Sequence, residues 1–141
     1  MSAVIRILLD TNIVLDVLAD RAPFAEDASM IFKLCETRQI EGVIYALTIP
    51  NIVYVMRKEL EREQISGVLQ KLSAIFEIAD MRAEDLRKAA ALPLSDFEDA
   101  LQSICAQRIK ADYIVTRNIK DFFQSKVMAV KPSELLERIQ H

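Results

Sequence analysis

Four aspartates in three separate segments are the residues of this sequence best suited to do chemistry together. Asp10 ends a short apolar run in IRILLDTN, Asp96 and Asp99 lie three residues apart in SDFEDALQ, and Asp121 precedes two phenylalanines in RNIKDFF. Carboxylates gathered in one cleft repel one another and raise their own pKa values unless a cation compensates. Oxygen-only ligands suit Mg²⁺ or Mn²⁺ better than Zn²⁺. The four acids therefore predict a divalent-metal site that includes all of them.

The chemistry of such a site is hydrolysis of a phosphodiester. A bound ion activates a water and offsets charge on the leaving oxygen, so no histidine base is needed. The only histidine is His141, the last residue, which rules out histidine-based zinc sites and Ser-His-Asp catalysis. The net charge of −3 argues mildly against nucleic-acid binding, but bound cations would reverse the local potential.

A plainer interpretation covers part of the acidic segment. Acids near a helix N-terminus complement the helix macrodipole, which explains Asp96 and Glu98 adequately. Ser95 as N-cap, with Glu98 three residues later, has the pattern of a capping box. Asp99 lies one turn deeper and is followed by Ala100, so we expect it to be buried or to face a cleft.

Apolar runs bounded by turn signals predict five strands, with helical patterns between them. The strands are expected at residues 4–9, 42–46, 75–78, 113–116 and 127–130. This alternation predicts an α/β fold, a three-layer α/β/α sandwich with a mainly parallel central sheet. Ligands of such sheets bind outside the carboxyl ends of the strands. Asp10 ends the first predicted strand, and Thr116 to Asn118 follow the fourth.

Helical spacing of apolar residues predicts helices at 24–35, 49–60, 65–76 and 86–92, at the DFEDALQ segment, and at the C-terminus with Ser133 as its cap. The segment 51–72 is also typical of one long amphipathic helix. Its first half is apolar nearly all round, which predicts burial of more than one face.

Composition indicates a folded protein that forms one domain over residues 1–141. Apolar residues make up 52% of the chain, with only two glycines and four prolines. No run approaches the roughly 20 apolar residues of a membrane helix, and charges interrupt the only candidate signal peptide. Cys35 and Cys105 lie in helical apolar patterns and are expected to be reduced core thiols of a cytoplasmic protein.

The segments LLDTNIVLDVL, YALTIPNIVYVMRK, DFEDALQSICAQ and YIVTRNIKDF resemble, in order, the motifs of the PIN-domain family. Many prokaryotic members are VapC-type ribonuclease toxins of toxin–antitoxin pairs. The resemblance implies a PIN-like fold, an Mg²⁺- or Mn²⁺-dependent endoribonuclease, an RNA substrate and an antitoxin partner. It implies Asp10 as the first acid, Asp99 with its neighbour Asp96 as the central acids, and Asp121 as the last. Thr11, Asn12, Asn51, Thr116 and Asn118 are implied to line the substrate site.

Two positions depart from the family pattern. Asn51 stands where the family usually has a glutamate, and Asn118 where many members have another aspartate. An amide supplies no negative charge, so both changes are expected to weaken metal affinity. The sequence resembles a subgroup of the family that has the asparagine together with the D-F-E-D-A segment. Asn51 is alternatively a simple helix-start residue, since Thr48 and Pro50 already signal a helix there.

Two other functions are compatible with an aspartate after a buried strand. One is a PIN-like module that has lost activity and acts through RNA or protein contacts, with Asn51 and Asn118 in its favour. The other is a haloacid-dehalogenase-like phosphatase with an aspartate nucleophile. That class needs a second aspartate two residues later, and this chain has Asn12 there.

The amphipathic segments 25–38 and 51–72 also predict partners. Their apolar residues are Ile31, Phe32, Val53, Tyr54, Val55, Met56 and Leu60. One small domain covers only one face of each helix with its own sheet, so we expect a homodimer that also accepts a helical antitoxin segment near the acidic cleft. A helix enclosed wholly within the monomer is the alternative.

Overall fold

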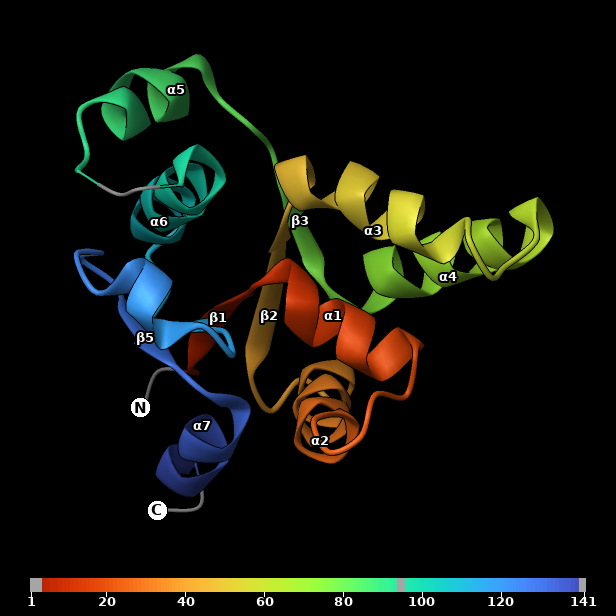
Figure 1. Cartoon of the computed structure of the whole chain (residues 1–141). Coiled ribbons are helices and arrows are strands. Elements are labelled where there is room, and N and C mark those ends of the chain that lie inside the picture. The colour runs from red at the N-terminus through yellow and green to blue at the C-terminus, as the bar shows by residue number, and fades with distance from the viewer. Residues whose placement is uncertain (1–3, 94–95, 140–141) are drawn as a thin grey trace.

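A five-stranded parallel sheet forms the centre of the structure, a computed structural model that describes residues 4–93 and 96–139 (Figure 1). The strands are β1 (Arg6–Leu9), β2 (Glu41–Tyr45), β3 (Glu77–Ala79), β4 (Tyr113–Val115) and β5 (Met128–Val130). Their order is β3-β2-β1-β4-β5, and every neighbouring pair is parallel. The five predicted strands and the α/β fold class are confirmed.

The strand order reverses between β1 and β4, which makes this pair the switch point of the sheet. Ile7 of β1 lies opposite Gly42 of β2 on one side and Tyr113 of β4 on the other. Chain connections leave β1 and β4 in opposite directions, so a crevice opens at their carboxyl ends. Asp10 and Thr116 are the residues that follow these two strands.

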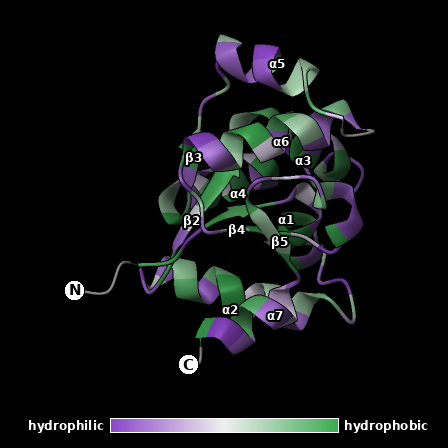
Figure 2. Cartoon of the chain, turned by 90° about the vertical axis from the view of Figure 1, so that its left-hand side faces the viewer, coloured by the Kyte–Doolittle hydropathy of each residue, from purple (hydrophilic) through white to green (hydrophobic). Residues whose placement is uncertain are grey.

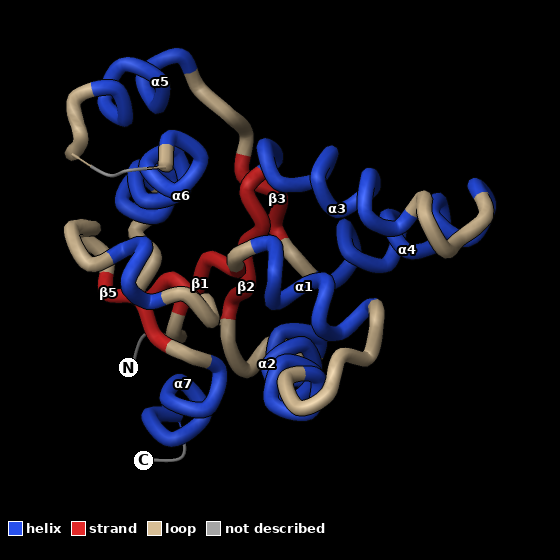
Figure 3. Tube along the Cα trace, in the orientation of Figure 1, coloured by secondary structure: helices blue, strands red, loops and turns tan. Residues whose placement is uncertain are grey.

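Helices cover both faces of the sheet (Figures 1 and 3). One face packs against α1 (Thr11–Leu18), α2 (Ala25–Glu36), α3 (Ile49–Met56), α4 (Arg62–Ile75) and α7 (Pro132–Ile139). The other packs against α5 (Ala83–Ala90), α6 (Phe97–Arg108) and the short 3₁₀ helix η2 (Ile119–Phe122). A second 3₁₀ turn, η1 (Ala46–Thr48), leads into α3.

The apolar run before Asp10 is buried on both sides, as predicted for a central parallel strand. Ile7 and Leu9 belong to the core under α1 and α2, whereas Leu8 belongs to the core under α6. Hydropathy colouring shows strands with apolar residues in the centre and helices that carry both apolar and polar residues around them (Figure 2). In the described ranges, no helix is both long and apolar enough to cross a bilayer.

The predicted long helix over 51–72 is wrong, because the chain breaks between α3 and α4. Glu61 adopts an extended backbone, and its N–H donates a hydrogen bond of 2.9 Å to the side-chain oxygen of Gln64. This capping box starts a new helix at Arg62. On α3, Ile52 and Met56 are buried while Tyr54 is 65% exposed, so the helix buries one face within the chain.

Two predicted helix caps also differ from the structure. Helix α7 begins at Pro132, so Ser133 lies inside its first turn and does not cap it. Ser95 lies outside the described residues, and the cap of α6 is Asp96, whose carboxylate accepts a 3.1 Å hydrogen bond from the Asp99 N–H. A side chain one position later thus satisfies the free N–H groups of the first turn.

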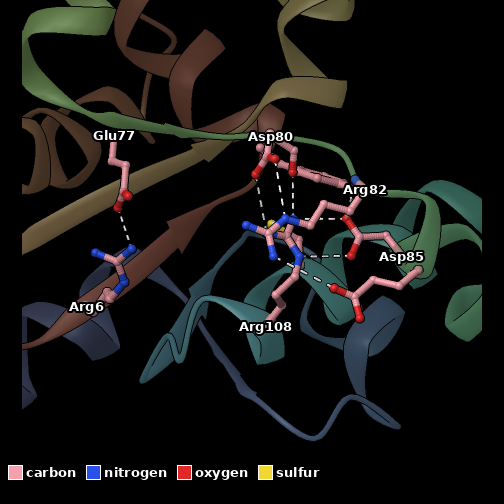
Figure 4. A network of polar contacts seen from close by, with 9 residues as sticks. Arg6, Glu77, Asp80, Arg82, Asp85 and Arg108 are labelled. Atoms are coloured by element: carbon pink, nitrogen blue, oxygen red, sulfur yellow. Dashed lines mark hydrogen bonds and ion pairs between the residues drawn. The ribbon is translucent and has the colours of Figure 1, made fainter.

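A buried ion pair attaches α5 to α6 at the side of the sheet (Figure 4). Arg108 donates to both oxygens of the fully buried Asp85 at 2.9 and 3.0 Å, and the Tyr45 hydroxyl donates at 2.8 Å. Burial raises the pKa of Asp85, but these bonds and one from the Arg82 N–H outweigh it and hold the pKa below its usual value. This network is structural and lies apart from the switch point.

The two cysteines are free thiols buried in the core, as predicted. Burial raises the pKa of both Cys35 and Cys105 to about 12, so neither is a reactive thiolate at neutral pH.

Candidate functional site

Asp10 lies at the carboxyl end of β1 with its side chain fixed by three donors. Its Oδ1 accepts from the Thr11 N–H at 2.8 Å and from Gln102 Nε2 at 3.2 Å. Its Oδ2 accepts from the Thr116 hydroxyl at 2.8 Å. Only 7% of the residue is exposed, and no cation is among these partners. The arrangement holds a negative charge in one orientation at the switch point of the sheet.

The first turn of α6 brings further carboxylates to Asp10. Asp96 caps the helix, and Asp99 lies partly buried one turn in. The pKa of Asp99 is raised to about 7: burial is the largest cause, followed by the carboxylates of Asp96, Asp10, Asp121 and Glu98. Carboxylates from three separate chain segments therefore act on Asp99, and no basic side chain of the described residues is among the causes of its shifted pKa.

Asn51, at the start of α3, contacts this group through Glu98. Its side-chain amide donates a hydrogen bond of 3.0 Å to Glu98 Oε1. Burial and the charges of Asp96 and Asp10 raise the pKa of Glu98, while the bond from Asn51 lowers it. The sequence explained Glu98 as a helix-dipole and capping-box residue. Its bond to Asn51 and the effect of the Asp96 and Asp10 charges on its pKa group Glu98 with these acids.

The turn after β4 supplies the opposite wall. The Thr116 hydroxyl, fully buried, donates to Asp10 and accepts from the Asn118 N–H at 3.0 Å. Asp121 follows in η2, exposed at the surface but near enough to raise the pKa of Asp99. Asn118 reaches this network through its backbone, and its side chain has no hydrogen bond to the described residues. The same is true of the side chain of Asn12, in the first turn of α1.

Besides Glu98, sequence reasoning missed Gln102, which contacts Asp10, and Asp16, which holds Arg117 in the turn after β4. Gln102 is 1% exposed and donates to Asp10, and its spacing of three from Asp99 on α6 was the available signal. Asp16 is fully buried and accepts from Arg117 Nε at 2.8 Å and Nη2 at 3.2 Å. No local sequence pattern indicates the Asp16–Arg117 pair, because its members are 101 residues apart.

The comparisons with known proteins identify the family of this fold. A family model described as a PIN domain matches residues 6–120. The chain belongs to the PIN-domain family. A search of curated proteins returned no match to this chain.

Several solved structures share the fold of this PIN domain. VapBC2 of Rickettsia felis, bound to a DNA fragment from its promoter, has a chain with a TM-score of 0.67 at 19% identity, covering 90% of this chain and 98% of that one. A toxin–antitoxin complex from Klebsiella pneumoniae has a chain with a TM-score of 0.69 at 23% identity, and the match covers 89% of this chain and 96% of that one. FitAcB from Neisseria gonorrhoeae has a TM-score of 0.67 at 17% identity, and the match covers 90% of this chain and 98% of that one. These likenesses establish the fold.

The oxygen atoms of this PIN domain fit a hydrated divalent cation. Two buried oxygens beside Asp10, Thr11 Oγ1 and Gln102 Oε1, have no hydrogen-bond partner within the described residues. In that same part of the chain, no three histidine, cysteine, aspartate or glutamate side chains are grouped closely enough to enclose an ion. Mg²⁺ binds through one or two carboxylates and keeps several waters, so an open acidic site suits it better than a closed cage.

Proposed function

We propose that this PIN domain is a divalent-metal-dependent endoribonuclease that hydrolyses RNA phosphodiester bonds and acts as the toxin of a toxin–antitoxin pair. The observation that carries the proposal is the uncompensated acidic site at the β1–β4 switch point, where the pKa of Asp99 is raised to about 7. A cleft with this charge disfavours an RNA phosphate by itself. It becomes a phosphate site only with Mg²⁺ or Mn²⁺ present.

Asp10 and Asp99 are the residues we expect to hold the ion, with Asp96 and Asp121 near it. When bound, the ion activates a water and stabilises the leaving oxygen of the phosphodiester. The Asp10 carboxylate is held in one orientation for binding the ion, because three hydrogen bonds fix it. The buried Thr11 hydroxyl, which has no protein partner in the described residues, is left to bond a buried water.

Glu98 supplies the negative charge that position 51 lacks. The amide of Asn51 holds its carboxylate at 3.0 Å, so the charge lies on the first turn of α6 instead of on α3. This arrangement supports an active site despite the asparagine. Asn12 and Asn118, whose side chains have no hydrogen bond to the described residues, are left to contact the substrate or its waters, whereas Asn51 holds Glu98 and the buried Thr116 positions Asp10.

A matched pair of variants tests the nuclease. Asp10→Asn and Asp99→Asn are expected to lose Mg²⁺- or Mn²⁺-dependent cleavage of RNA by at least about 100-fold while still folding. Asp20→Asn is the control, because Asp20 is exposed at the end of α1 and has a backbone φ of 49°, which asparagine tolerates. Cleavage that persists in either site variant contradicts the assignment.

A binding module without activity is the second candidate, favoured by the uncharged amide of Asn51. Titration with Mn²⁺ separates the two. A nuclease binds the ion and loses binding in Asp99→Asn, whereas a module that contacts RNA without metal binds RNA equally well in the presence of a chelator.

The toxin role requires partners. The exposed side of α3 offers a surface for them, since Tyr54 is 65% exposed and grooves of about 580 and 460 Å³ flank the helix on its α4 and α1 sides. Similar structures include toxin–antitoxin complexes. We expect a homodimer that accepts a helical antitoxin segment. Light scattering tests the homodimer. Protein at tens of micromolar, a range that detects weak association, is expected to be dimeric, and a strictly monomeric species contradicts this expectation.

A further inference from the structure

A second hollow lies at the same edge of the sheet as the acidic site. We call it the Phe24 pocket; its volume is about 370 Å³, and its lining includes Phe24, Asp27, Arg117, Asn118, Lys131 and Ser133. These residues come from the start of α2, the turn after β4 and the start of α7. Nothing in the acid chemistry described above uses Phe24, Asp27, Lys131 or Ser133.

The pocket contains a rigid aromatic and cationic pair. The Arg117 guanidinium lies over the Phe24 ring at 4.0 Å from its centroid, and Phe24 remains 41% exposed. Two hydrogen bonds to the fully buried Asp16 fix the plane of that guanidinium. Arg117 Nη1 has no hydrogen-bond partner within the described residues. A flat, immobile surface with a free cationic donor suits a planar ring that carries a nearby negative charge.

The other lining residues match the remaining parts of a nucleotide. Lys131 and Ser133 flank the first turn of α7, where a cation, a hydroxyl and helix N–H groups favour an anion such as a phosphate. Asp27 adds the opposite kind of group. Its carboxylate accepts hydrogen bonds from the amino groups of bases. An aromatic ring, two cations and one acceptor in a pocket of this volume match a base and its phosphate.

The Phe24 pocket is connected to the acidic site by one short turn. Asn118 lines the pocket, and its N–H donates to the Thr116 hydroxyl, which donates to Asp10. The pocket and the site of Asp10 therefore share the turn that follows β4.

We propose that the Phe24 pocket binds one nucleotide of the RNA strand next to the phosphodiester that is cut. Its base stacks on the exposed part of the Phe24 ring, and its phosphate contacts Lys131 and Arg117. The inference rests on the proposed ribonuclease function and deepens it. The pocket, separate from the acids, determines which nucleotide is positioned beside the cleavage site.

Binding of RNA to a non-cleaving protein tests the proposal. The probe is a fluorescein-labelled, single-stranded RNA of ten nucleotides, measured by anisotropy with the Asp10→Asn protein in Mg²⁺. Adding Phe24→Ala is expected to weaken binding by about 5- to 150-fold, the range for one base–aromatic stack. Adding Phe24→Tyr keeps the ring and is expected to preserve binding. Adding Lys131→Ala is expected to make the plot of log binding constant against log salt concentration shallower, by about 0.7 in slope.

Two variants on α5 serve as controls. Leu86→Ala removes an apolar side chain that is 49% exposed, and Lys88→Ala removes an exposed cation, both on the opposite face of the sheet. Neither is expected to change RNA binding. Phe24 is 41% exposed and precedes α2, so its truncation is expected to leave that helix folded, which a thermal melt verifies.

The outcomes distinguish the pocket from the nuclease. If Phe24→Ala binds RNA as tightly as Leu86→Ala does, while the unaltered protein still cleaves RNA in a metal-dependent way, the pocket assignment is overturned and the nuclease stands. If the unaltered protein neither binds nor cleaves RNA, both proposals fall. Competition by the four ribonucleoside 5′-monophosphates, lost in Phe24→Ala, identifies which base the pocket prefers.

Discussion

Asn51 and Glu98 lie 47 residues apart in the chain, and the side-chain amide of the first donates a 3.0 Å hydrogen bond to the carboxylate of the second. The bond joins the start of α3 to the first turn of α6. It places a negative charge beside Asn51, one of the two positions at which this chain has an amide where the resemblance implies an acid.

Because Asn51 and Glu98 are in contact, we expect that the carboxylate can stand at either position without changing the charge of the site. Asn51→Glu alone puts a second carboxylate at hydrogen-bond distance from Glu98, so the unfolding temperature should fall without metal and recover with Mn²⁺. Glu98→Gln alone should weaken Mn²⁺ binding in a calorimetric titration by about tenfold or more. Combining both changes restores one acid and one amide, and should return the affinity toward that of the unaltered protein. Unchanged Mn²⁺ affinity in Glu98→Gln would place Glu98 outside the site.

The raised pKa of Asp99 predicts a specific dependence of stability on pH. Its ordinary value is 3.8 and its value in the folded protein is about 7, so the folded state binds the proton more tightly than the unfolded state. By linkage, this contribution to stability is fully present below about pH 4 and is lost as the pH rises through 7. Metal-free protein should therefore melt at a lower temperature at pH 8 than at pH 5.

Asp99→Asn is the variant that isolates this effect. It removes the titrating group, so the melting temperature in chelator should fall less between pH 5 and pH 8 than in the unaltered protein. Asp20→Asn should keep the full slope. Equal slopes in all three proteins would contradict the pKa assigned to Asp99.

The buried carboxylate of Asp16 is expected to dominate the stability of the α1 side. Asp16→Asn leaves Arg117 without its charged partner and weakens the contact with Arg21 at 3.6 Å. Breaking one member of a buried pair costs about 3–5 kcal/mol, and chemical denaturation measures it. The exposed Asp20→Asn should change stability by less than about 0.5 kcal/mol. A loss below about 1 kcal/mol in Asp16→Asn would mean that the pair is not important for folding.

The two glycines of the chain are predicted to respond oppositely to alanine. A Cβ at Gly42 would lie 2.6 Å from both Cys35 Sγ and Phe76 Cδ1, in the packed core, so Gly42→Ala should destabilise by about 1–3 kcal/mol. A Cβ at Gly67, in the middle of α4, meets nothing within 4 Å. Gly67→Ala should stabilise by about 0.5–1 kcal/mol, because alanine favours the helix. Denaturant midpoints of the two variants that shift in the same direction would contradict this packing.

The sequence by itself determined the sheet and the edge at which the site lies. The apolar runs that end in Asp10 and Thr116 predict buried strands, because the local pattern of apolar residues indicates which segments are buried. It also grouped Asp96 with Asp99, because helical spacing fixes which neighbours share a face. The break at Glu61 had a local signal in the capping box with Gln64, which the longer apolar pattern obscured.

Only the tertiary structure decided which distant side chains meet. The bonds from Asn51 to Glu98, from Gln102 to Asp10 and from Arg117 to Asp16 join residues 47, 92 and 101 positions apart. Each depends on where the sheet places the starts of helices from different crossovers, and no local pattern encodes that distance. The same reason hides the Phe24 pocket, whose lining residues come from three segments that meet only at the carboxyl edge of the sheet.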